Sequence, residues 1–170
     1  MSRAPELIRL EQLLSLVGKE DSHLQAVRDR LIPTGSQINL EWLEATLADD
    51  AGADRLESFG AKFARMQDTV IDKLLPQLLK VAGETPMAAI DNLNRAERLG
   101  FITSSDTWLD MRRLRNRLVH EYIESLEDML PALKRAYAFT DELHNSYEAM
   151  SEYARNNLGA RTPNASQTTP

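Results

Sequence analysis

The spacing of the apolar residues constrains the fold of this chain more than any other feature of its sequence. In the segment "DRLESFGAKFARMQDTVIDKLLPQLLKV", residues 54–81, they return every three or four positions, which places them along one side of an α-helix. The stripe is made of Leu56, Phe59, Phe63, Met66, Val70 and Leu74. Other segments repeat the spacing, and none shows the alternation of a β-strand. The pattern predicts an all-α protein built as a bundle of four to five helices.

Turn and capping residues predict where the helices begin and end. Besides the segment above, helices are expected over residues 5–31, 40–47, 86–99, 105–122 and 125–156. Gly18 is expected to bend or interrupt the first helix. Pro76 is expected to kink or end its helix, because its ring clashes with the carbonyl four residues earlier. Thr85 should cap the next helix, with Pro86 in the first helical position and Gly100 at the C-terminal end.

Clusters of small and polar residues mark the expected loops and domain limits. "DDAGAD", residues 49–54, should form a loop, and residues 33–54 as a whole should form an insertion that contains a short helix. Residues 158–170, "LGARTPNASQTTP", should form a disordered tail. A single helical domain over residues 1–157 is therefore expected. With 170 residues, 42% of them hydrophobic, the chain is long enough to bury a core.

Composition excludes several classes of protein. The chain has no cysteine, which removes disulfide scaffolds and thiolate metal sites. No apolar run approaches the roughly 20 residues of a membrane-spanning helix, and charges interrupt the apolar positions of the N-terminal segment. A cytoplasmic protein without a membrane partner is expected. The net charge of −6 argues against a general nucleic-acid coat.

A local basic cluster departs from this acidic background. The stretch "MRRLRNRLVHEY", residues 111–122, places four arginines within six residues and follows them with a histidine and a tyrosine. On a helix, Arg115 and His120 lie about 7.5 Å apart along the axis and roughly 140° apart around it. The two side chains can border one groove. Asn116, four residues before His120, shares its face and could orient the imidazole.

These residue types suit the cleavage of an RNA phosphodiester without a metal ion. A two-fold dimer along this helix would bring two arginines and two histidines into one cleft. The imidazole of His120 would exchange protons with the 2′-hydroxyl or the leaving oxygen, and Arg115 would stabilise charge on the phosphoryl oxygens. The neighbouring cations that would contact RNA phosphates are Arg112, Arg113 and Arg117.

Other interpretations of the cluster remain open at this point. Arginines on a helix are usually a solvated face, and an aromatic residue at helical spacing is more often a packing residue than a reactive one. His23 and His144 have no comparable neighbours in the sequence and are assigned no function. His120 and Glu121 are adjacent on a helix and point in different directions, so no metal site is expected.

The motif resembles the signature of a known family. "RNRLVHEY" matches Arg, four residues, His, any residue and Tyr, as in the HEPN superfamily and specifically its HepT-like toxins. The polar Asn116 directly after Arg115 and the lead-in "WLDMRRLRN", which begins at Trp108, are similar to that group as well. The resemblance spans about residues 5–156, although its specific part is residues 108–122.

The resemblance implies a fold, an activity and a partner. HepT-like proteins are HEPN-fold homodimers that act as metal-independent endoribonucleases, the toxins of type VII-like toxin–antitoxin pairs. By this resemblance Arg115 and His120 would be catalytic, Asn116 would support them, and no cofactor would be needed. Tyr122 matches the tyrosine that accepts AMP from a minimal nucleotidyltransferase (MNT) antitoxin. The RNA substrate would be a tRNA or an mRNA.

Two functions of other classes compete with the nuclease. The chain could be a non-catalytic HEPN accessory subunit that binds nucleotide or substrate for a partner nucleotidyltransferase. It could instead be a helical interaction module whose "RRLRNR" stretch binds an acidic partner, in which case His120 would be dispensable. Fold alone does not choose among them, because function depends on the site.

Overall fold

The computed structural model of the chain describes residues 4–120 and 125–162, and every regular element within these ranges is helical. The predicted all-α bundle is confirmed. The helices are α1 (Pro5–Leu31), α2 (Leu40–Ala48), α3 (Asp50–Thr69), α4 (Leu75–Val81), α5 (Ala89–Arg98), α6 (Ser105–His120) and α7 (Leu126–Leu158), with a π-helical turn, η1 (Val70–Leu74), between α3 and α4. No described helix is both long and apolar enough to cross a lipid bilayer.

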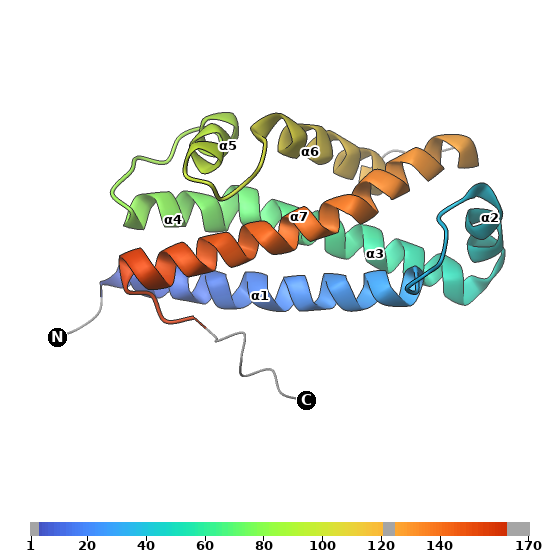
Figure 1. Cartoon of the computed structure of the whole chain (residues 1–170), viewed down its shortest axis with the longest axis horizontal. Coiled ribbons are helices and arrows are strands. Elements are labelled where there is room, and N and C mark those ends of the chain that lie inside the picture. The colour runs from blue at the N-terminus through green and yellow to red at the C-terminus, as the bar shows by residue number, and fades with distance from the viewer. Residues whose placement is uncertain (1–3, 121–124, 163–170) are drawn as a thin grey trace.

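Three long rods form the body of the bundle. α1, the continuous α3–η1–α4 rod and α7 run side by side, while α5 and the motif helix α6 cover one flank and α2 closes one end (Figure 1). Apolar residues from all of these helices join one buried cluster. Ring contacts connect the helices at its centre, because Phe139 of α7 lies edge-on to both Phe63 of α3 and Trp108 of α6.

The close approach of α1 to α7 explains a glycine in the middle of α1. The helix runs without interruption through Gly18, against expectation. A Cβ atom built on Gly18 would lie 2.5 Å from the hydroxyl oxygen of Tyr147 on α7. Gly18 therefore makes room for a neighbouring helix and does not break its own.

Pro76 neither ends its helix nor stands in a regular α-helical turn. The helix continues to Val81, and the turn just before the proline is π-helical, with the Leu75 N–H bonded to the Val70 carbonyl. A proline ring clashes with the carbonyl four residues earlier when the helix is regular. The wider π-turn changes the position of the carbonyls below the ring, so the rod passes the proline intact.

The predicted loop at residues 49–54 is wrong. Asp49 caps α3 by accepting a hydrogen bond from the Gly52 N–H at 3.1 Å, so "DAGAD" forms the first turns of that helix. The glycine is needed for packing, since a Cβ on Gly52 would lie 2.3 Å from the Thr46 carbonyl oxygen of α2. The insertion at residues 33–54 is therefore mostly helical, with α2 folded tightly against the start of α3.

The predicted start of the helix at Pro86 is also wrong, because α5 begins at Ala89. The side chain of Asn92 bonds to both the N–H and the carbonyl of Met87, at 2.9 and 3.0 Å. These bonds hold the backbone of Met87 in the non-helical segment before α5, and Ala88 is extended. The predicted C-terminal end at Gly100 is confirmed, as this glycine has a φ of 80° and the Phe101 N–H reaches the Ala96 carbonyl.

The C-terminal boundary differs from the one predicted. Leu158 is the last residue of α7, and Gly159 ends the helix in the left-handed conformation. Ala160 is buried, and the N–H of Arg161 bonds to the carboxylate of Glu11 on α1. Residues 158–162 are thus part of the folded domain, and residues 163–170 lie outside the described residues.

Candidate functional site

The motif helix α6 is fixed to the bundle at its N-terminal end. Ser104 caps it by accepting a hydrogen bond from the Thr107 N–H at 3.3 Å. The indole N–H of Trp108, a fully buried residue, donates to Glu142 of α7 at 3.1 Å, and the same carboxylate oxygen accepts two bonds from Thr103 at 3.0 Å. These contacts hold the N-terminal end of α6 against α7.

Two of the four arginines face the α3–η1–α4 rod and are paired there. Arg112 donates from one nitrogen to both carboxylate oxygens of Asp72, at 3.0 and 2.9 Å. Arg115 donates from Nη2 to the carboxylate of Asp68. Only 16% of the Arg115 side chain is exposed, which leaves its guanidinium mostly enclosed beside α3. Two ion pairs therefore tie α6 to the rod.

The other two arginines lie on the outer face of α6. Arg113 is exposed and pairs with Asp110 one turn earlier, at 3.0 Å, and Arg117 is also exposed. The "RRLRNR" cluster is therefore divided by the helix period into an inward pair and an outward pair. Only the outward pair forms the kind of solvated face that arginines on a helix usually make.

Asn116 contacts Arg115 in this structure. Its amide oxygen accepts a hydrogen bond from Nη1 of Arg115 at 2.7 Å. The Asn116 amide and the Asp68 carboxylate thus both hold the guanidinium. His120 is the last residue of α6, and its side chain lies outside what the structure describes, as does the whole of Tyr122. The predicted relation of Asn116 to His120 stays a prediction.

An open groove of about 440 Å³ lies between Arg115 and the α3 side of the rod. It is lined by Ala61, Ala64, Arg65, Asp68, Thr69, Asp72, Lys73 and Arg115. Three cationic side chains and two carboxylates therefore face this space, and Arg112 adds a cation through its bond to Asp72. The groove is locally positive in a chain whose net charge is −6.

A buried carboxyl group lies beneath this groove. Glu20 of α1 is 8% exposed, and its Oε2 accepts a hydrogen bond from the hydroxyl of Thr69 at 3.0 Å. Burial raises the pKa of Glu20, and the Thr69 bond and the charges of Arg65 and Lys73 oppose that effect without cancelling it. The pKa of Glu20 is thus higher than that of an exposed glutamate, with burial as the first cause.

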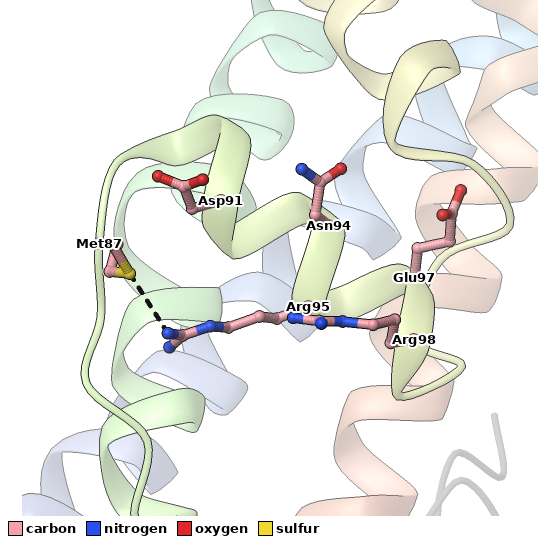
Figure 2. A pocket seen from close by; sticks show the side chains of 6 residues that line it. All are labelled: Met87, Asp91, Asn94, Arg95, Glu97 and Arg98. Atoms are coloured by element: carbon pink, nitrogen blue, oxygen red, sulfur yellow. Dashed lines mark hydrogen bonds between the residues drawn. The ribbon is translucent and has the colours of Figure 1, made fainter.

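A second hollow, of about 370 Å³, lies on α5 and is shown in Figure 2. Arg95 points along it toward the Met87 sulfur and donates to the Thr85 carbonyl at 2.5 Å. Glu97 and Asn94 each bond to Ser105 at the start of α6. Arg95, Glu97 and Asn94 are thus engaged within the chain, and they join α5 to its neighbours.

Sequence reasoning missed an aspartate–histidine pair. Nδ1 of His144 lies 2.7 Å from Oδ2 of Asp21, which is 8% exposed, and Gln25 donates to the other oxygen of that carboxylate. The pair ties α7 to α1, and neither residue is among those that line the groove beside Arg115. Because 123 residues separate the two side chains, no local pattern could have indicated the contact.

Neither a metal-ion site among the described residues nor a known relative points to the chemistry of this site. Among the described residues, no group of three or more histidine, aspartate and glutamate side chains is placed to hold a metal ion. Searches of protein-family models, curated proteins and solved structures find no match to this chain. The function must therefore be argued from the residues of the groove and of α6.

Proposed function

We propose that this chain is the toxin of a type VII-like toxin–antitoxin pair and acts as a metal-independent endoribonuclease. The observation that carries the proposal is the setting of Arg115. Its guanidinium is held by Asp68 and Asn116 at the wall of an open, locally positive groove, on the helix that ends in His120. An arginine held in this way meets a phosphate with little further ordering of its side chain.

The proposed reaction uses the ribose 2′-hydroxyl as nucleophile. A base removes its proton, the 2′-oxygen bonds to phosphorus, and the bond from phosphorus to the 5′-oxygen breaks as that oxygen receives a proton from an acid. Arg115 stabilises the charge on the non-bridging oxygens. A histidine carries protons near neutral pH, so His120 from each protomer of a homodimer supplies the base and the acid.

Arg113 and Arg117 are the better placed of the flanking arginines for contacts to RNA phosphates. Both lie on the exposed face of α6, whereas Arg112 is bonded to Asp72. Arg113 also pairs with a carboxylate, that of Asp110, but 78% of its side chain is exposed against 31% for Arg112, so solvent weakens its pairing more. The proposal therefore assigns the flanking contacts mainly to the outward pair.

The regulation that we propose acts at Tyr122. Transfer of AMP from ATP to its hydroxyl by an MNT-type nucleotidyltransferase antitoxin, with release of pyrophosphate, would add a phosphate anion seven residues along the chain from Arg115. That anion competes with substrate phosphate for the same cation. The RNA substrate in the cell would be a tRNA or an mRNA, and the protein would act in the cytoplasm.

A specific observation favours a second function. Arg112 and Arg115 are both neutralised by carboxylates of the rod, as expected if they serve to hold α6 in place. The chain would then be a non-catalytic HEPN accessory subunit that binds nucleotide or substrate for a partner nucleotidyltransferase. The same pairing weakens the reading as a module that binds an acidic partner through all four arginines.

The deciding experiment measures RNA cleavage in EDTA. Purified protein is incubated with mixed tRNA and ribosomal RNA beside His120→Ala and Arg115→Lys, and intact-mass spectrometry identifies any molecules that carry AMP. We expect unmodified wild type to cleave RNA and both variants to be at least about 100-fold slower. Arg115→Lys keeps the charge opposite Asp68 but loses the guanidinium fork.

Arg113→Lys, on the exposed face of the same helix, is the matched control and should retain most of the activity. If unmodified, dimeric wild type leaves every RNA intact, the nuclease proposal fails and the accessory function becomes the better account.

A further inference from the structure

Arg65 and Lys73 have no part in the motif of α6, yet they face the same groove as Arg115. Both are exposed, and they stand on the rod opposite α6, eight residues and roughly 12 Å apart along the helix. Because the chain as a whole is acidic, its solubility does not require two cations at this place.

The carboxylates of the groove are already engaged by other cations. Asp68 is bonded to Arg115 and Asp72 to Arg112. Glu20 is buried beneath the groove and bonded to Thr69; it does not line the groove, although the charges of Arg65 and Lys73 act on its carboxyl group. The positive charges of Arg65 and Lys73 are thus the ones that a ligand entering the groove would meet at its exposed edge.

We propose that the groove between α3 and α6 binds the backbone of single-stranded RNA next to the scissile phosphate, with Arg65 and Lys73 each contacting a phosphate. This inference rests on the proposed ribonuclease function. Among the described residues that line the groove, none is aromatic. Recognition here acts on the backbone, because bases would need aromatic partners to stack on. The contacts supply affinity and register and little sequence preference.

Counterion release provides a test that a structural role would not affect. Each phosphate contact adds about 0.7 to the negative slope of log K against log salt concentration for a single strand. The variant Arg65→Gln/Lys73→Gln should therefore lose about 1.4 of that slope. Its dissociation constant at 100 mM NaCl should rise about tenfold.

The measurement uses a fluorescein-labelled 20-nucleotide RNA of mixed sequence, in EDTA, with the full chain carrying His120→Ala so that the RNA stays intact. Arg30→Gln/Lys134→Gln is the charge-matched control, since it also removes one arginine and one lysine from exposed positions that lie outside the groove. The control should change neither the affinity by more than about twofold nor the salt slope.

The outcomes separate this proposal from the nuclease proposal. Equal effects of the two double variants, or no RNA binding by the parent chain, would overturn the subsite. Cleavage by the wild type with an unchanged salt slope in Arg65→Gln/Lys73→Gln would leave the nuclease standing and remove only the subsite. Groove-dependent binding without cleavage would keep the subsite and remove the nuclease.

Discussion

Glu20 is a buried carboxyl group beside a groove that is lined by cations. It is 8% exposed and bonded to Thr69, and burial is the largest cause of its raised pKa. A group whose pKa is higher in the folded state binds its proton more tightly there. The contribution of Glu20 to stability is therefore fully present below the ordinary carboxyl pKa. It is lost as the pH rises from the pKa of the unfolded chain to that of the folded chain.

Glu20→Gln should remove that pH dependence. The amide is neutral at every pH and keeps the size of the side chain and an acceptor for Thr69. We expect a higher Tm than wild type at pH 7 and a difference that disappears near pH 4, measured by circular dichroism. A Tm difference that is constant from pH 4 to pH 8 would show that the charge of Glu20 does not matter.

The inward and outward arginines of α6 show what a sequence reveals about single residues. Arg112 and Arg115 are three positions apart, so helical geometry alone predicts that they share a face. Their partners, Asp72 and Asp68, are 40 and 47 residues away. No local pattern names those partners, because they are set by how α6 lies against the rod.

At the scale of elements, a glycine inside a helix can be required because a neighbouring helix leaves no room for a side chain. Gly52 and Gly60 both lie inside α3, but a Cβ on Gly52 would meet the Thr46 carbonyl oxygen, while a Cβ on Gly60 has no atom within 4 Å. Alanine is a better helix former than glycine at both positions. Packing and propensity therefore act in opposite directions only at Gly52.

Gly52→Ala should lower the free energy of unfolding by about 1–3 kcal/mol, as overpacking does. Gly60→Ala, the internal control, should raise it by about 0.5–1 kcal/mol through helix propensity. Urea denaturation followed by circular dichroism measures both. If Gly52→Ala were as stable as Gly60→Ala, the tight corner between α2 and α3 would be wrong.

The errors made at element ends share a physical cause. "DDAGAD" was expected to be a loop and Pro86 to begin a helix, since aspartate, glycine and proline favour both loops and helix starts. The choice was made by groups three to six residues away in the chain that cap a helix end or pack against it. The Thr46 carbonyl oxygen lies so close to residue 52 that only glycine fits there, and the side chain of Asn92 bonds to the backbone of Met87.

At the scale of the whole molecule, one apolar cluster connects all the helices. Trp108 is fully buried in α6 at its centre, while Trp42 in the short helix α2 packs against its edge. A domain with a single continuous core is expected to unfold in one cooperative step. The fluorescence of Trp108 therefore reports unfolding at the centre of the core, and that of Trp42 reports unfolding at its edge.

Single-tryptophan variants, Trp42→Phe and Trp108→Phe, should each unfold in one transition when followed by fluorescence in urea. In each variant, the fluorescence midpoint should agree with the midpoint of helix loss measured by circular dichroism. An earlier midpoint for the fluorescence of Trp42 would mean that α2 unfolds separately from the rest of the bundle.

The sequence by itself determined the helices, their buried faces and the arginine-rich motif, because each depends on spacing along a single helix. Only the tertiary structure decided the carboxylates that pair with Arg112 and Arg115, the groove with Arg65 and Lys73, and the contact of Asp21 with His144. Each of these joins residues tens of positions apart in the chain. Such contacts depend on which helices are neighbours and at what depth they pack, and no local pattern carries that information.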